Sequence, residues 1–172
     1  MKLMVIDGNS MINRSFYGIR PLSTRDGLYT HAVFGFLTTL TRLREEEKPD
    51  AVCVTFDVHA PTFRPTAEES YKATRKPMLE GWEADDLIGT ISRRCEADVW
   101  ECVVVTGDKD SLQLITDHTK VKLVSTRMGQ TTTRDMTEET FREQYGFAPI
   151  HMIDLKALMG DASDNIPGVP GV

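Results

Sequence analysis

Three aspartates stand where strand-like runs end, and together they could bind a ligand. Asp7, Asp57 and Asp108 each follow a short run of apolar and β-branched residues. Ligands of an open parallel sheet bind beyond the carboxyl ends of its strands, so these carboxylates are expected at one edge of one sheet. One such aspartate is weak evidence, because aspartate is common in turns and at helix N-termini. Three at one edge predict a shared site.

A second group of acids opens a predicted helix. Glu83, Asp85 and Asp86 lie within four residues, and Glu83 and Asp86 are one turn apart on one helix face. Favourable charge at a helix N-terminus explains one or two of these acids. It does not explain three of them before an apolar pair, which favours a role in the same site.

A third pair, Asp161 and Asp164, lies in a segment rich in turn formers. Asx hydrogen bonds in a turn explain this pair equally well. With Asp110, which follows Asp108 by two residues, the acids are numerous enough for two metal ions. The candidate metal ligands are Asp7, Asp57, Glu83, Asp85, Asp86, Asp108, Asp110, Asp161 and Asp164.

Crowded carboxylates raise each other's pKa unless cations accompany them. Mg²⁺ or Mn²⁺ prefers oxygen ligands, and two such ions can activate a water and stabilise the leaving oxygen in an attack on phosphorus. The four histidines are scattered, which makes zinc an unsuitable metal. No serine has an evident His/Asp relay. The pattern therefore predicts hydrolysis of phosphodiesters by metal-bound water.

The most concentrated basic stretch contains Tyr71, Lys72 and Arg75. On a helix these three side chains lie within one turn, which offers a stacking surface beside two phosphate-binding cations. A solvated amphipathic helix explains the composition slightly better, so the residues alone leave both interpretations open.

Alternating elements must position these side chains. The predicted strands are Leu3–Ile6, Ala51–Phe56, Cys102–Thr106, Val121–Val124 and Gln130–Arg134. The predicted helices are Thr30–Glu47, Glu83–Glu96, Thr137–Tyr145 and Pro149–Met159. The first three strands are nearly continuous apolar runs, typical of strands buried on both faces of a parallel sheet. Met128-Gly129-Gln130 predicts a hairpin between the last two, and the whole pattern predicts an α/β fold.

Composition bounds the function classes. The chain has 172 residues, 40% hydrophobic content and a net charge of −6. The acidic total does not exclude nucleic acid, because bound cations would invert the field at an acidic cluster. No stretch approaches the roughly 20 apolar residues that cross a bilayer, so no membrane partner is expected. Three cysteines without CxxC spacing are most simply thiols in a reducing cytoplasm.

Several sequence blocks, taken in order, resemble one family. They are Ile6-Asp7-Gly8-Asn9-Ser10, Phe56-Asp57, Tyr71-Lys72-x-x-Arg75, Glu80-Gly81-Trp82-Glu83-Ala84-Asp85-Asp86, Thr106-Gly107-Asp108-Lys109-Asp110 and Gly160-Asp161-x-Ser163-Asp164-Asn165-Ile166-Pro167-Gly168-Val169. The chain resembles the 5′–3′ exonuclease domains of bacterial DNA polymerase I, within the flap endonuclease family. The resemblance covers almost the whole chain.

The resemblance implies a PIN-like or resolvase-like α/β fold, with a mostly parallel central sheet flanked by helices. It implies cleavage of 5′ flaps, nicks and RNA-primer remnants, with Mg²⁺ or Mn²⁺ as cofactor. Asp110, Asp161 and Asp164 would serve the second ion and the other six acids the first, with Asp108 and Asp110 counted as catalytic. Lys72 and Arg75 would polarise the scissile phosphate, and Tyr71 would stack on a base.

The resemblance also implies a domain division. Residues 1–159 would form the catalytic domain, and residues 160–172 the start of a helix-three-turn-helix that binds duplex phosphates, often around K⁺. Asn165, Gly168 and Gly171 would contact DNA there. The family has several tens of further residues, including a helical arch, where this chain has only Lys76-Pro77-Met78-Leu79 before Glu80. The helical arch is therefore expected to be missing from this sequence between residues 76 and 80.

A polymerase domain in the same native chain, a monomer and a bacterial cytoplasmic, nucleoid-associated location are further expectations. Two alternative functions remain. A PIN-type ribonuclease shares strand-end acids but usually has fewer. A non-catalytic DNA-binding module would use the acids to hold structural metal. An aspartyl phosphatase is disfavoured, because its first strand should end in Asp-x-Asp and this chain has Asp7-Gly8-Asn9.

Overall fold

The computed structural model describes residues 1–57, 82–162 and 165–171. In these residues one five-stranded sheet has the order β2-β1-β3-β4-β5. β1, β2, β3 and β4 run parallel, and β5 pairs antiparallel with β4. The strands are β1 (Lys2–Asp7), β2 (Ala51–Thr55), β3 (Glu101–Thr106), β4 (Thr119–Arg127) and β5 (Gln130–Met136). The predicted mostly parallel sheet is confirmed.

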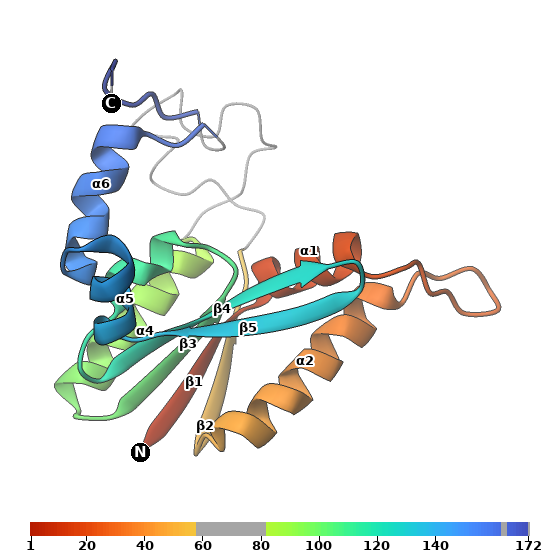
Figure 1. Cartoon of the computed structure of the whole chain (residues 1–172). Helices are drawn as coiled ribbons and strands as arrows, with labels where there is room; N and C mark the ends of the chain where they lie inside the picture. Colours follow the sequence, from red (N-terminus) through yellow and green to blue (C-terminus); the bar gives the residue numbers. More distant parts are fainter. Residues whose placement is uncertain (58–81, 163–164, 172) are drawn as a thin grey trace.

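Helices cover both faces of this sheet (Figure 1). The α-helices are α1 (Gly8–Gly18), α2 (His31–Glu47), α4 (Ala84–Ala97), α5 (Glu138–Tyr145) and α6 (Met152–Met159), with 3₁₀ helices η1 (Asp110–Leu114) and η2 (Pro149–His151). α1 and α2 pack against one face, and α4 and α5 lie on the other. The result is a three-layer arrangement in which, among the described residues, the carboxyl ends of β1 and β3 face a pocket.

Side chains of the central strands alternate between two hydrophobic cores, because successive residues of a strand point to opposite faces. Met4 and Ile6 of β1 join the core under α1 and α2, whereas Val5 joins the core under α4. In β3, Val103 and Val104 divide in the same way. Both strands are therefore buried on both faces, as their continuous apolar sequence predicts.

The prediction that a strand with a continuous apolar sequence is buried on both faces was wrong for β2. This strand lies at the edge of the sheet among the described residues, and Val52 is 38% exposed. An apolar run does not by itself distinguish a central strand from an edge strand. Cys53 of β2 is likewise only half-buried, although Cys95 and Cys102 are buried thiols.

Most other element boundaries differ little from expectation. The helix expected over 149–159 begins as η2 and continues as α6, and the hairpin at Met128–Gly129 joins β4 and β5. β4 extends in both directions beyond the run Val121–Val124. In the part of the chain that the structure describes, no helix is long and apolar enough to cross a bilayer.

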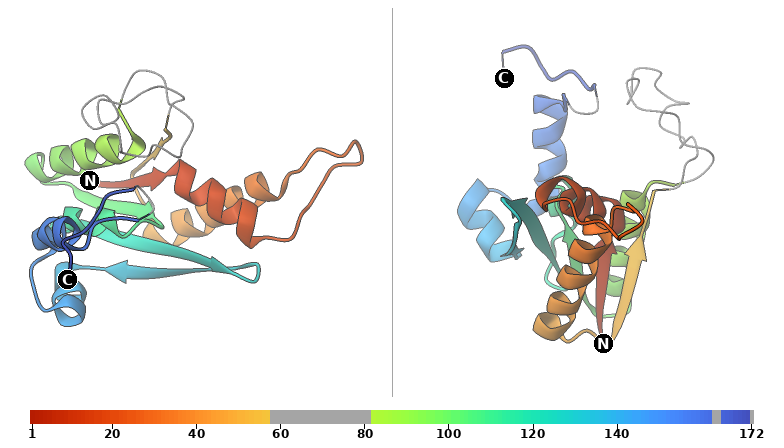
Figure 2. Two further views of the ribbon diagram at one scale, coloured as in Figure 1. Left: turned by 90° about the horizontal axis from the view of Figure 1, so that it is seen from above. Right: turned by 90° about the vertical axis from the view of Figure 1, so that its right-hand side faces the viewer.

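The sequence did not predict α1. Its buried residues are Gly8, Met11 and Ser15, so the face that packs inward shows no apolar stripe. Small residues there allow close contact with α2: a Cβ on Gly35 would lie 2.7 Å from the hydroxyl of Ser15. The loop after α1 and the β4–β5 hairpin extend to the same side of the molecule (Figure 2).

The strand order fixes where a ligand site forms. The chain leaves β1 for β2 on one side and later returns to β3 on the other side of β1. The carboxyl ends of β1 and β3 therefore flank the point where the strand order reverses, which is the usual ligand site of open α/β sheets.

Candidate metal centre

Asp7 lies at the centre of this edge, 6% exposed, as the last residue of β1 and the N-cap of α1. Its Oδ1 accepts a hydrogen bond from the backbone N–H of Ser10 (2.9 Å), and its Oδ2 accepts one from the hydroxyl of Thr106 (2.7 Å). Burial raises the pKa of Asp7, and the charges of Asp57 and Asp108 add to the rise, against the two hydrogen bonds. Asp7 therefore caps α1 and also lines the acidic pocket.

Asp57 connects the end of β2 to two helices. Its carboxylate accepts hydrogen bonds from the side-chain amide of Asn9 (2.7 Å) and from the backbone N–H of Ala84 (2.7 Å). Asn9 belongs to α1 and Ala84 begins α4, so the carboxylate lies at the meeting point of three elements. Asp57 lies beyond the end of β2, and these two hydrogen bonds hold its carboxylate in place.

The start of α4 supplies Glu83, Asp85 and Asp86. Asp86 accepts a hydrogen bond from the backbone N–H of Glu83 (2.9 Å), which is the capping role expected of an acid there. Burial and the charges of Asp7, Asp108, Asp57 and Glu83 raise the pKa of Asp85 to about 7. Part of the Asp85 residue nevertheless remains accessible to solvent, so water screens some of the effect of burial and of this repulsion.

Asp108 and Asp110 follow β3 in a turn. The backbone N–H of Asp108 donates to the Thr106 hydroxyl (3.0 Å), and that of Asp110 donates to the Asp108 carboxylate (2.9 Å). On the other side of the turn, Arg14 donates to the carbonyl oxygen of Gly107 (2.6 Å). A Cβ on Gly107 would lie 1.6 Å from the guanidinium of Arg14, so glycine permits this contact.

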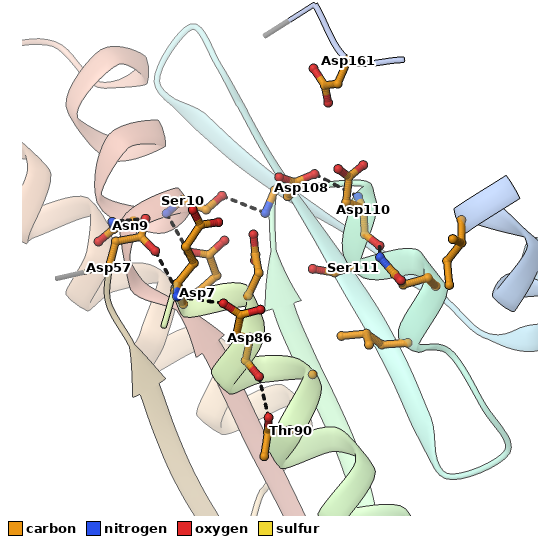
Figure 3. Close-up of a pocket in the computed structure, with 18 of the residues that line it drawn as sticks. Asp7, Asn9, Ser10, Asp57, Asp86, Thr90, Asp108, Asp110, Ser111 and Asp161 are labelled. Carbon is orange, nitrogen blue, oxygen red and sulfur yellow. Dashed lines mark hydrogen bonds between the residues drawn. The ribbon is translucent and has the colours of Figure 1, made fainter. Parts of the chain in front are cut away.

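Asp161 arrives from the far end of the chain. α6 ends at Met159, Gly160 has a φ of 70°, and the backbone of Asp161 exchanges two hydrogen bonds with Ile166 (both 2.9 Å). This turn directs Asp161 toward the start of η1 (Figure 3). There Lys156 contacts both Asp161 (2.9 Å) and Asp110 (2.8 Å).

These five segments enclose one pocket of about 1090 Å³. Figure 3 shows the carboxylates gathered above the carboxyl ends of the strands. Eight of the nine predicted metal ligands line the pocket: Asp7, Asp57, Glu83, Asp85, Asp86, Asp108, Asp110 and Asp161. Asp164, Tyr71, Lys72 and Arg75 lie outside the described residues.

The other residues predicted to contact DNA lie in the segment after α6 and do not line the pocket. A Cβ on Gly168 would lie 2.2 Å from the carbonyl oxygen of Met159, so glycine is required there by close packing on α6. Gly171 has a φ of 90°, which favours glycine, and Asn165 has a φ of 59°. Asn165, Gly168 and Gly171 thus have backbone positions set by chain reversal and by packing on the end of α6.

The donor chemistry of the pocket fits divalent metal ions. Its acids offer oxygen ligands alone, which Mg²⁺ and Mn²⁺ prefer. A cation, the Lys156 ammonium, already stands between Asp110 and Asp161. Within the described residues, however, no three potential ligands stand together in a ready-made metal geometry. Protein donors hold Asp7, Asp57 and Asp110 instead, and metal binding would exchange some of these contacts.

Sequence reasoning missed the residues that orient the acids. Thr106 and Asn9 each donate to a strand-end carboxylate, and Lys156 bridges two acids. Thr106 and Asn9 sit next to the acids in sequence, which is a usable signal. Lys156 could have been singled out only by its position five residues before Asp161.

Comparison with known proteins gives a consistent result. The chain matches the family described as 5′–3′ exonuclease, N-terminal resolvase-like domain, over residues 2–80 and 77–146. It is 41% identical to DNA polymerase I of Bacillus subtilis over 195 aligned positions, which cover 99% of this chain and 22% of that protein. DNA polymerase I of Mycobacterium tuberculosis is 37% identical, with the same coverage. The chain thus spans about a fifth of the length of these curated relatives.

Solved structures share the fold. The bacteriophage T5 5′-exonuclease with bound divalent zinc matches with a TM-score of 0.77 at 21% identity, over 100% of this chain and 71% of that one. The T5 flap endonuclease, in a pseudo-enzyme-product complex with DNA and metal ions, matches with a TM-score of 0.75 at 20% identity and the same coverage. The resolvase-like architecture predicted from the sequence is confirmed.

Proposed function

Because the chain belongs to the family of 5′–3′ exonuclease N-terminal resolvase-like domains, we propose that it hydrolyses phosphodiesters of DNA, and of RNA-primer remnants, as a metal-dependent 5′–3′ exonuclease and 5′-flap endonuclease. The observation that carries this proposal is the convergence of eight carboxylates, from five segments, in one pocket. A generic acidic surface would not bring together residues from both ends of the chain.

The proposal assigns two ions to this pocket. Asp7, Asp57, Glu83, Asp85, Asp86 and Asp108 would hold the first, and Asp110, Asp161 and Asp164 the second. When bound, Mg²⁺ or Mn²⁺ supplies an activated water and stabilises the leaving oxygen of an in-line displacement. K⁺ would bind at the segment after α6.

The chain's own residues orient this set. Thr106 holds one oxygen of Asp7, and the backbone N–H of Ser10 holds the other. Asn9 and the N–H of Ala84 do the same for Asp57. Such supporting hydrogen bonds narrow the conformations of ligating carboxylates and are part of a functional metal site.

Substrate selection is assigned to residues beside the pocket. Lys72 and Arg75 would contact the scissile phosphate and Tyr71 would stack on a base, with Asn165, Gly168 and Gly171 on the duplex.

The division into a catalytic domain (1–159) and the start of a helix-three-turn-helix (160–172) belongs to the proposal, as does a polymerase domain in the native chain. Alignments longer than this chain, and a family match that breaks at 77–80, support an extra segment there in the relatives.

The test compares Asp108→Asn with wild type on a 5′-labelled flap DNA in Mg²⁺ and in Mn²⁺. Removing one ligand charge should lower the cleavage rate by roughly two orders of magnitude or more. Binding of the same flap, measured by fluorescence anisotropy in EDTA, should stay within about threefold, because the fold is unchanged. The matched control is Asp117→Asn, since Asp117 is exposed and outside the pocket.

Cleavage by Asp108→Asn at the wild-type rate would contradict the assignment. Faster cleavage of single-stranded RNA than of flap DNA would favour a PIN-type ribonuclease. Flap binding without cleavage by wild type in either metal would favour a non-catalytic module.

A further inference from the structure

One lysine stands inside the group of acids assigned to the second ion. The Nζ of Lys156 lies 2.8 Å from Oδ1 of Asp110 and 2.9 Å from Oδ2 of Asp161. Asp110 begins η1, whereas Asp161 follows α6. Lys156 therefore joins the carboxylates of two segments that lie far apart in the sequence.

The backbone builds this contact. Lys156 lies in the last turn of α6, and its carbonyl oxygen accepts from the N–H of Gly160 (2.8 Å). The positive φ of Gly160 and the bridge between Asp161 and Ile166 then reverse the chain, so that Asp161 returns to the lysine. The backbone turn after α6 therefore brings the Asp161 carboxylate next to Lys156.

The charges explain why a cation belongs there. Asp108 and Asp161 both repel Asp110. Among the described residues, Lys156 is the cation whose ion pairs with Asp110 and Asp161 are recorded. Lys156 offsets this repulsion, so the two carboxylates can lie close together where α6 and η1 are in contact.

The contact is also easily broken. The side chains of Lys156 and Asp110 are 35% and 40% exposed, and that of Asp161 is 21% exposed. Ion pairs at such exposure contribute little to stability, and a lysine can swing its ammonium group into solvent on a flexible stem. Lys156 can hold the acids together and still leave them.

We propose that Lys156 is a positioning residue that holds Asp110 and Asp161 together before the second ion binds, and that it must release both oxygens for that ion to bind. This inference rests on the proposed function, because it assumes that these two acids belong to a metal site. It follows that Lys156 weakens the binding of the second ion relative to the first. Lys156 thereby makes the two binding events sequential.

The experiment is a calorimetric titration of the full chain with MnCl₂ in the absence of DNA. Lys156→Met removes the charge and keeps the length, Lys156→Gln is a second neutral variant, and Lys156→Arg keeps the charge. The neutral variants should bind the weaker ion about threefold to tenfold more tightly than wild type, which is the scale of a partly exposed ion pair. Lys156→Arg should stay within about twofold of wild type.

The matched control is Lys109→Met. Lys109 lies next to Asp110 in sequence and is exposed, but it makes no recorded ion pair in the described part of the chain. It therefore removes the same charge near the same acids without removing the contact. Equal tightening by Lys109→Met and Lys156→Met would overturn the inference, as would unchanged or weaker binding by Lys156→Met.

A second readout separates this role from plain structural support. In EDTA the Tm of Lys156→Met should fall below that of wild type, and saturating Mn²⁺ should remove the difference, because the ion replaces the ammonium. A deficit that persists in Mn²⁺ would overturn the inference and indicate a purely structural lysine.

The two proposals fail in different ways. Wild type that binds two Mn²⁺ ions and cleaves flap DNA, with Lys156→Met indistinguishable from it, defeats this inference alone. Wild type that binds Mn²⁺ with the predicted Lys156 effect but cleaves no flap DNA supports this inference and defeats the proposed function. Wild type that binds no Mn²⁺ overturns the inference.

Discussion

At the scale of single residues, Asp85 carries much of the repulsion in the pocket. Aspartic acid ordinarily has a pKa of 3.8, but burial and four neighbouring carboxylates raise that of Asp85 to about 7. Near neutral pH, and without metal, this group sits at the midpoint of its titration. A bound cation would restore its charged form and release a proton.

This shift predicts a pH-dependent gain in stability for Asp85→Asn in EDTA. Well below pH 3.8, Asp85 is protonated in both folded and unfolded chains and costs nothing. As the pH rises from 3.8 to about 7, the unfolded chain loses this proton while the folded chain keeps it, so the stability of wild type falls and then levels off above pH 7. The stability of the Asn variant has no such fall. At pH 8 the variant should be more stable by on the order of 1 kcal/mol, reduced from the full shift by solvent screening.

Urea denaturation at pH 4, 6 and 8 measures this difference. Asp117→Asn, which changes an exposed acid outside the pocket, should track wild type at every pH. An advantage of Asp85→Asn that stays constant from pH 4 to pH 8 would show that its carboxyl group is not perturbed.

The acids of the site were predictable from sequence, and their supporting residues were not. Residue type and position after a strand suffice to select Asp7, Asp57 and Asp108. Thr106 and Lys156 belong to residue types found throughout any surface, and their roles depend on which segments become neighbours in space. That β1 lies beside β3 is a property of the sheet order, which local patterns do not encode.

At the scale of elements, two glycines let segments approach closely in different ways. A Cβ on Gly168 would meet the backbone carbonyl of Met159 at 2.2 Å, whereas a Cβ on Gly107 would meet the end of the Arg14 side chain. The backbone at the end of a helix cannot move unless the turn that follows moves as well. A guanidinium group at the end of a flexible side chain can move without moving the backbone.

Gly168→Ala should therefore destabilise the protein more than Gly107→Ala. We expect a cost of about 1–3 kcal/mol for Gly168→Ala, as for overpacking, and less than about 1 kcal/mol for Gly107→Ala. Gly89→Ala is the control, because its Cβ would have its nearest neighbour at 3.8 Å, within a helix that favours alanine. Free energies of unfolding from urea titrations test the order, and an equal or reversed pair would contradict the packing argument.

Elements with a continuous or periodic apolar pattern were predicted to within a few residues, and α1 was not. Its inward face carries glycine and serine beside the single apolar residue Met11, because it packs closely on α2. A helix that is positioned by small residues gives no hydrophobic period. The position of β2 at the edge of the sheet was not predicted either. Burial of a strand depends on which strands lie beside it, and its own sequence does not specify them.

At the scale of the whole molecule, the two ends of the sheet carry opposite electrostatic arrangements. The carboxyl ends hold the acidic pocket. At the amino ends, Glu47 at the end of α2 contacts Lys2 of β1 and both Lys120 and Lys122 of β4, each at 2.9 Å. Lys122 also contacts Asp135 of β5, so one charge network joins four elements.

Burial would raise the pKa of Glu47, but hydrogen bonds from the three lysines outweigh it and lower the pKa to about 2. Glu47→Gln should therefore destabilise the protein by about 3 kcal/mol at pH 7, because buried Lys122 loses a partner. The contribution of Glu47 is present above its ordinary pKa of 4.5 and is lost as the pH falls through 2. The difference between variant and wild type should shrink over that range.

Thermal and urea unfolding at pH 7 and pH 3 measure this effect. Glu138→Gln is the control, since Glu138 forms an i,i+4 ion pair with Arg142 outside this network and its side chain is 35% exposed. Its cost should stay below about 1 kcal/mol. Equal costs for the two variants would mean that the buried network contributes no more than a surface pair.

The turn that brings Asp161 to the pocket has a consequence for the timing of activity. The first carboxylate of the pocket lies at residue 7 and the last one described lies at residue 161. The ribosome must therefore synthesise the whole segment between them before this set of carboxylates is complete. On the proposed function, a chain interrupted before residue 161 lacks a ligand of the second ion and would not cut nucleic acid, including the messenger from which it is being read. On this proposal, nuclease activity would appear only after the elements that form the pocket have been synthesised.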